Sequence, residues 1–202
     1  PAQYVTANVE LAKKALKEGD TCSAVAYLEA AKEYPVNIGE GKLAGAQENN
    51  INYYLGCAYE QLGDHNKAIA YLEAASVGLE EPSSAMFYYD QPPHMIFYQG
   101  LAHLKLGNRE RAFSRFNKLV DYGEKHIFEK QSIDYFAVSL PDFLVFEEDL
   151  DRKNQIHCNY MMGLGHIGLG NMDKAQRYLQ KVLELDPNHQ GAALHLNEWI
   201  HE

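Results

Sequence analysis

The sequence has few cysteines, and none of them stands at a metal-binding or redox spacing from another. Cys22, Cys57 and Cys158 are the three cysteines among 202 residues, and no CxxC motif occurs. An odd number of widely separated cysteines argues against a disulfide framework, and a structural zinc site needs clustered ligands. We therefore expect buried, reduced thiols in a cytoplasmic chain that holds no metal and no cofactor.

The sequence also lacks a long hydrophobic run and any excess of basic charge. No stretch approaches the roughly 20 apolar residues that a membrane-spanning helix needs. Asp and Glu number 28 against 18 Lys and Arg, so the formal net charge is −10. A nucleic-acid backbone would be repelled by that charge, and no Lys- and Arg-rich run offsets it. We therefore expect neither a membrane nor a nucleic acid as partner.

Sequence signatures of common catalytic sites are missing as well. HExxH, a P-loop, a Rossmann glycine pattern and a G-x-S-x-G elbow do not occur. The acidic run at residues 147–151 has two interpretations. It can supply a carboxylate pair for glycoside chemistry, or it can be the solvated start of a helix, where the helix dipole favours acidic side chains. The second is the commoner case, and the sequence predicts that the chain is not an enzyme.

One pattern of residues occurs four times along the chain. In each clear copy, a glycine is followed at fixed offsets by an aromatic residue or histidine, a second glycine, an alanine and a large apolar residue. The three clear copies are Gly56, Tyr59, Gly63, Ala68, Leu72; Gly100, His103, Gly107, Ala112, Phe116; and Gly163, His166, Gly170, Ala175, Leu179. A weaker copy has Ala12, Ala15, Gly19, Ala24, Leu28. This pattern resembles the tetratricopeptide repeat, a helix–turn–helix unit of 34 residues.

Each position of the pattern has a physical reason. The first glycine lies inside a helix, where glycine costs about 1 kcal/mol relative to alanine, and its benefit is a closer approach by the second helix. The second glycine ends the first helix in the left-handed conformation that glycine adopts most easily. Cap-type residues follow it directly and open the second helix: Asp20, Asp64, Asn108 and Asn171.

The resemblance implies an all-α fold, a right-handed α–α superhelix of about four repeats within a single domain, 1–202. We predict repeats at 3–34, 50–77, 93–121 and 152–185, with a capping helix at 188–200. Individual helices are expected at 3–18, 21–33, 50–62, 65–77, 93–106, 109–121, 152–168, 172–185 and 188–200. The pattern alanines at 24, 68, 112 and 175 are 44, 44 and 63 residues apart. The repeats are therefore separated by inserts, and we expect extra short helices in the largest, near 122–149.

In the tetratricopeptide-repeat family the first helix of each repeat lines a concave groove, so the resemblance also implies a partner site. A groove of aromatic and apolar side chains suits an extended peptide or an inserted helix. The alternative is that these side chains are covered by the third insert. The groove positions are Tyr53, Cys57, Gln61, Phe97, Leu101, Lys105, Tyr160 and Leu164.

One known binding mode of the family does not fit this sequence. Cochaperone repeats bind a C-terminal carboxylate with a clamp of Lys, Asn and Arg side chains. The corresponding positions here are Val9, Lys13, Tyr54, His94 and Tyr98. Lys13 is the one Lys or Arg among them, and it stands where the family has Asn. The sequence predicts that the carboxylate clamp is absent.

A second resemblance rests on residues 134–143 (DYFAVSLPDF), 97–100 (FYQG) and 159–163 (NYMMG). These segments resemble the C-terminal repeat region of large bacterial proteins of unknown function, in which a mutarotase-like β-sandwich precedes the repeats. We expect a non-catalytic interaction module that belongs to a larger bacterial protein, an expectation that Pro1 in place of Met also favours. Its partner would be a protein, a peptide or another domain of the parent chain. The alternative is an accessory helical domain of a carbohydrate-active enzyme.

Overall fold

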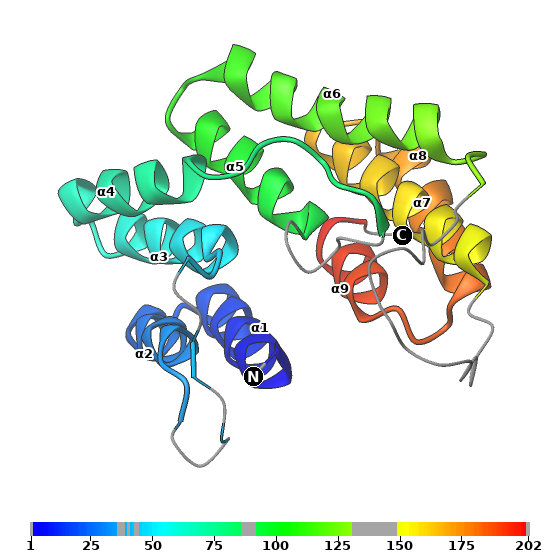
Figure 1. Ribbon diagram of the computed structural model, residues 1–202. Coiled ribbons are helices and arrows are strands. Elements are labelled where there is room, and N and C mark those ends of the chain that lie inside the picture. The colour runs from blue at the N-terminus through cyan, green and yellow to red at the C-terminus, as the bar shows by residue number, and fades with distance from the viewer. Residues whose placement is uncertain are drawn as a thin grey trace. The chain divides into compact units, whose positions relative to one another are not determined.

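The structure is a computed structural model that describes residues 2–35, 39, 41–42, 45–85, 92–130 and 149–200. Within these ranges the chain is helical apart from turns and connecting segments, and it contains no strand (Figure 1). The all-α fold class is confirmed. The extra short helices expected near 122–149 fall mostly on residues 131–148, which lie outside the described residues.

The helices lie where the repeat pattern places them. In order they are α1 (Ala2–Glu18), α2 (Thr21–Lys32), α3 (Asn49–Gln61), α4 (His65–Ser76), α5 (Pro93–Lys105), α6 (Arg109–His126), α7 (Leu150–Gly168), α8 (Met172–Leu185) and α9 (Gln190–Trp199). All but one begin and end within two residues of the predicted bounds.

The exception is α6, which was predicted to end at 121 and ends at His126. Its last turns are held by α7. The side-chain amide of Asn154 donates to the His126 carbonyl at 2.7 Å. A Cβ on Gly123 would lie 2.4 Å from Cγ of Met162, so the two helices approach closely at that point. Tertiary packing therefore extends α6 beyond the residues that the repeat pattern covers.

The chain divides into two compact units, which we describe separately. One comprises Pro1–Glu80 and His94–Arg115, and the other Glu81–Pro93 and Phe116–Glu202. Within the first unit α1 packs on α2, α2 on α3, and α3 on α4; within the second, α7 packs on α8 and α8 on α9 (Figure 1). The assignment of 1–202 to one domain stays a prediction.

The turn between the two helices of a repeat is the same in all four copies. Gly19, Gly63, Gly107 and Gly170 have φ between 75° and 80°. Each glycine amide donates to the carbonyl three residues before it, and the next amide donates to the carbonyl five residues before it, as in Asp64 to Tyr59 at 2.9 Å. This is the Schellman arrangement, which satisfies the last carbonyls of a helix. The predicted role of the second glycine is confirmed.

The cap-type residue after each of these glycines has a more variable role. The Asp20 and Asp64 carboxylates accept hydrogen bonds from the amides of Ser23 and Lys67 and open the second helix as predicted. The hydrogen bonds from Ser23 hold the pKa of Asp20 below its usual value. Asn171 is different, because its side chain makes no capping bond. Its amide nitrogen lies 3.4 Å from Nδ1 of His166 instead, so the prediction of a side-chain cap was wrong at this position.

The first glycine of the pattern permits close packing of the two helices. A Cβ on Gly56 would lie 2.7 Å from Cγ of Leu72, and one on Gly163 would lie 2.6 Å from Cδ2 of Leu179. Contacts that short do not occur between real carbon atoms, so either the leucine or the helix would have to move. The pattern alanines on the second helices, such as Ala68 and Ala175, are buried in the same interface.

The segment between α4 and α5 is held to the helices by polar side chains. Asn49 donates to the Ala75 and Val77 carbonyls, each at 2.8 Å, and Gln99 donates to the Leu79 carbonyl at 2.9 Å. In the second unit Lys118 pairs with Glu81 at 2.5 Å, and Nε2 of His157 lies 2.8 Å from the Ser83 carbonyl. An apolar anchor follows at Ala85, which is buried. The repeat spacing predicts an insert here, but the sequence does not indicate which residues hold it to the helices.

Gly56→Ala tests whether close packing or helix propensity dominates at the first glycine. Propensity alone predicts stabilisation by about 1 kcal/mol. Because Leu72 occupies the space that a Cβ needs, we expect destabilisation by about 1–3 kcal/mol in urea unfolding.

A double-mutant cycle with Leu72→Ala supplies the control for this prediction. In the Leu72→Ala background the clash is gone, so Gly56→Ala should be neutral or stabilising there. A Gly56→Ala variant that is more stable than wild type would contradict the packing explanation.

Candidate partner-binding site

The structure buries most of the side chains that were predicted to line a groove. Tyr53, Phe97 and Leu101 in the first unit have exposed fractions of 7%, 0% and 7%, while Tyr160 and Leu164 in the second have 1% and 0%. Cys57 is half-buried, and Gln61 and Lys105 are exposed. Three of the eight positions are therefore open to a partner in this structure. A groove formed by all eight stays a prediction.

In the first unit the buried aromatic residues form one cluster between α3 and α5. The ring centroids of Tyr53, Tyr54 and Tyr98 lie 5.2–5.5 Å apart, and Phe97 lies 5.4 Å from Tyr98. The hydroxyls of Tyr54 and Tyr98 are 3.1 Å apart, within hydrogen-bonding distance. Edge-to-face aromatic pairs of this kind contribute about 0.5–1.5 kcal/mol each beyond their burial. The cluster joins the second repeat to the third.

Lys13 of α1 lies at the edge of this aromatic cluster. Its ammonium is 2.6 Å from Oε1 of Glu10 and 5.5 Å from the centre of the Tyr54 ring. The residue is 7% exposed. The one basic side chain at the positions of the carboxylate clamp is therefore buried and already paired with a carboxylate.

The accessible part of the predicted site is a polar strip on α3 and α5, formed by Cys57, Glu60, Gln61 and Lys105, which we call the α3–α5 strip. Nζ of Lys105 lies 2.5 Å from Oε2 of Glu60. Burial lowers the pKa of Lys105, but the hydrogen bond and charge of Glu60 outweigh that effect and leave the pKa raised. Gln61 accepts a hydrogen bond from the Thr21 hydroxyl at 3.0 Å, which links the strip to α2.

Cys57 is the sulfur-bearing member of the α3–α5 strip. Burial raises the pKa of its thiol, and the nearby Lys105 only partly opposes the shift. Because the thiolate is the nucleophilic form, a raised pKa makes Cys57 a poor nucleophile near neutral pH. The strip can offer a partner a cation, a carboxylate and an amide, but not an activated nucleophile.

In the second unit the predicted groove residue Tyr160 is covered by α9. The Tyr160 hydroxyl lies 3.2 Å from Nδ1 of His195, and its ring centroid lies 4.7 Å from that of His189. A Cβ on Gly191 would lie 2.5 Å from the same hydroxyl, so α9 approaches the ring directly. The predicted capping helix therefore covers the first helix of the last repeat. The alternative cover, the third insert, lies mostly outside the described residues.

The three cysteines are free, but they differ in exposure. Cys158 is buried, and burial together with Glu129 raises the pKa of its thiol to about 12. Cys22 is exposed. The prediction of buried thiols is therefore correct for Cys158 and wrong for Cys22, which lies on the outward side of α2. In the part of the chain that the structure describes, no three His, Cys, Asp or Glu residues are grouped as a metal site would need.

The acidic run contributes to a helix start. The Asp149 carboxylate accepts a hydrogen bond from the Arg152 amide at 2.9 Å, and Asp151 lies in the first turn of α7. This agrees with the interpretation as a solvated helix start. The other two acidic residues of the run, 147 and 148, lie outside the described residues.

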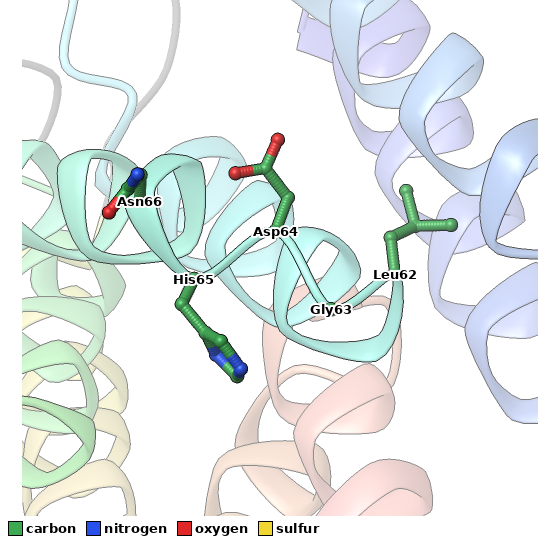
Figure 2. A pocket seen from close by; sticks show the side chains of 5 residues that line it. All are labelled: Leu62, Gly63, Asp64, His65 and Asn66. Atoms are coloured by element: carbon green, nitrogen blue, oxygen red, sulfur yellow. The ribbon is translucent and has the colours of Figure 1, made fainter.

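A shallow pocket lies at the turn between α3 and α4. Its lining consists of Leu62, Gly63, Asp64, His65 and Asn66, five consecutive residues. Figure 2 shows that the Asp64 and His65 side chains point to opposite sides of the chain rather than toward a common centre. The pocket is therefore the concave side of a tight turn and does not bring functional groups together.

Several buried histidines carry lowered pKa values. Burial lowers the pKa of His103, His157, His166 and His189, and for His157 it lowers the pKa to about 4. His166 stacks on Tyr178 with ring centroids 5.5 Å apart, as Tyr59 stacks on Tyr71 at the same position of the second repeat. These histidines are neutral, structural groups at neutral pH.

Three segments of the chain match sequence models of one family, described as tetratricopeptide repeat. The matched residues are 50–76, 95–122 and 157–189. They coincide with the helix pairs α3–α4, α5–α6 and α7–α8. The matches support a tetratricopeptide-repeat protein, and repeats of this family generally mediate protein–protein interactions. Among the described residues, no helix is both long enough and apolar enough to cross a membrane.

We expect the buried and exposed positions of the predicted groove to respond differently to truncation. Phe97→Ala should lower the free energy of unfolding by about 3–5 kcal/mol, because it removes a fully buried ring. Lys105→Ala should change it by less than about 1 kcal/mol, because its ion pair with Glu60 is exposed to solvent. Urea unfolding followed by circular dichroism measures both. Equal losses for the two variants would show that the burial pattern is wrong.

The low pKa of His157 predicts a pH-dependent stability. Between about pH 6.5 and 4 the unfolded chain binds a proton that the native His157 does not, so stability falls as the pH falls through this window. This group alone accounts for up to about 3 kcal/mol, from a shift from 6.5 to about 4. Unfolding measured across the window should show a shallower dependence for His157→Gln than for wild type. An unchanged slope in the variant would assign the effect to other groups.

Proposed function

We propose that this chain is a non-catalytic protein-interaction module whose α3–α5 strip contacts a protein or peptide partner. The observation that carries the proposal is the match of three segments to the tetratricopeptide repeat, a repeat that generally mediates protein–protein interactions. We favour the α3–α5 strip as the partner contact because Gln61 and Lys105 are the predicted groove residues that remain exposed.

The chemistry of the α3–α5 strip suits a polar contact on the partner. Lys105 and Glu60 form an ion pair at the surface, and Gln61 presents an amide beside it. A partner that carries a carboxylate can compete with Glu60 for the Lys105 ammonium. Such contacts at a solvent-exposed rim contribute mainly to specificity and association rate. The aromatic cluster beneath the strip fixes the relative positions of α3 and α5 and so holds the strip rigid.

The proposal also covers two further points, the kind of partner and the cellular compartment. The partner is either a separate protein or another domain of a longer bacterial parent chain, and the compartment is the cytoplasm. The first statement rests on the resemblance of residues 134–143, 97–100 and 159–163 to the repeat regions of large bacterial proteins. The second is supported by three cysteines that are all free. The alternative function, an accessory helical domain of a carbohydrate-active enzyme, rests on the same resemblance and on the acidic run at residues 147–151.

Selection of random peptides displayed on phage against the whole chain tests the proposal. Selected peptides should bind wild type in fluorescence anisotropy and lose about tenfold in affinity with Lys105→Glu, a change of about 1.4 kcal/mol. Lys174→Glu is the matched control, because it reverses an exposed lysine on α8, the second helix of a repeat. Binding that falls equally in both variants, or in neither, removes the strip from the interface.

A further inference from the structure

Two facing positions of the repeat, which we call the paired position, are filled differently in the third copy. One lies three residues after the first glycine, and the other lies three residues after the pattern alanine. In the second copy these are Tyr59 and Tyr71, whose rings stack at 5.4 Å with an angle of 2°. In the fourth they are His166 and Tyr178, stacked at 5.5 Å with an angle of 5°. In the third copy the pair is His103 and Arg115, so a histidine faces a cation instead of a ring.

The surroundings of His103 contain more positive than negative charge. The residue is 4% exposed, and within the described chain neither of its ring nitrogens has a hydrogen-bond partner. The charged groups that act on it are Arg115 and Arg111 from α6 and Glu80 from the segment before α5. Burial lowers the pKa of His103 first, the two arginines lower it further, and Glu80 opposes them. His103 is therefore neutral at pH 7, and a proton on it would place three cations around one carboxylate.

Arg115 also connects this position to the segment before α5. Its guanidinium pairs with Glu80, and its Nε donates to Oε1 of Gln99 at 3.0 Å. Gln99 in turn donates to the Leu79 carbonyl at 2.9 Å. The Arg115 side chain is 15% exposed and the Glu80 side chain 42%, so the guanidinium is mostly buried while its carboxylate partner reaches solvent.

Apolar burial adds little to the attachment of residues 77–80. Val77 and Leu79 are 64% and 61% exposed. The segment is held instead by the Asn49 amide on the Val77 carbonyl, the Gln99 amide on the Leu79 carbonyl and the Arg115 ion pair with Glu80. A change in charge beside Arg115 therefore acts directly on the Glu80 contact, and through Gln99 on the contact with the Leu79 carbonyl, two of the polar contacts that hold this segment within the described residues.

We propose that His103 is an acid-sensitive switch, and that its protonation releases residues 77–80 from α5 and α6. The added proton places a second cation beside the Arg115 guanidinium, on a side chain that is itself buried. Glu80 carries one negative charge and already pairs with Arg115, so opening the site becomes more favourable because it lets water reach both cations. Residues 77–80 carry Glu80, and Val77 and Leu79 within them are largely exposed, so this segment is the part that moves. The switch is independent of any partner bound at the α3–α5 strip.

Hydrogen–deuterium exchange of the whole chain, without any partner, tests this switch. After correction for the intrinsic pH dependence of amide exchange, opening of residues 77–80 should rise about tenfold between about pH 7.5 and pH 5 in wild type, because the open site binds a proton that the closed site disfavours. The rise should vanish in His103→Gln, which keeps a neutral polar side chain at the site. Peptides covering α2 serve as the internal reference.

Two further variants keep the test decisive. His166→Gln changes the histidine at the paired position of the fourth repeat, and it should leave the rise intact. Arg115→Gln removes the link to Glu80, so residues 77–80 should exchange rapidly at both pH values. A rise that persists in His103→Gln overturns the proposal, as does its absence in wild type. A rise that disappears in His157→Gln instead would assign the effect to the contact with Ser83 and would also overturn it.

Discussion

The close approach of the two helices in the second and fourth repeats is the constraint on which the rest of the structure depends. Gly56 and Gly163 leave no room for a Cβ beside Leu72 and Leu179, so the second helix lies against the backbone of the first. The glycine that ends the first helix makes this approach possible, because its positive φ reverses the chain within a few residues. A helix pair built this way is narrow, and its apolar side chains must find further cover on the neighbouring helix. Burial of these apolar side chains therefore favours packing of neighbouring helices against one another.

The stacking explains why the aromatic side chains of the first helices are buried. Tyr53 and Phe97 occupy matching positions; Tyr53 contacts the ring of Tyr98 across the α3–α5 interface, and Phe97 contacts the same ring from within α5. In the last repeat Tyr160 occupies the same position, and α9 supplies the cover. Side chains at this position stabilise the contact between successive first helices, whatever the partner is. Gln61 and Lys105 lie about two turns further along the same helices, and both are exposed to solvent.

The repeat pattern was sufficient to predict the fold but only part of the candidate site. Glycine and alanine offsets are local and strict, so they placed nearly every helix within two residues, and α6 departed because its end packs on α7 rather than on its own repeat. Exposure depends on what the neighbouring repeat covers. Tyr53 and Lys105 follow from the same pattern, yet one is buried and the other exposed. Polar contacts such as the hydrogen bond from Gln99 to the Leu79 carbonyl could not be predicted from the sequence. A single glutamine in an apolar helix belongs to no repeated pattern, so the sequence does not indicate which group accepts its hydrogen bond.

Variation among the repeats is therefore concentrated where the backbone rules permit it. The second glycine and the pattern alanine are the same in all four copies, but in the three clear copies the paired position beside them holds two tyrosines, a histidine with a tyrosine, or a histidine with an arginine. Two stacked rings contribute packing alone. A histidine beside Arg115 contributes packing while it is neutral and repulsion once it is protonated, because Glu80 already pairs with Arg115. Replacing one aromatic side chain thus makes a structural position responsive to pH without disturbing the backbone that defines the repeat.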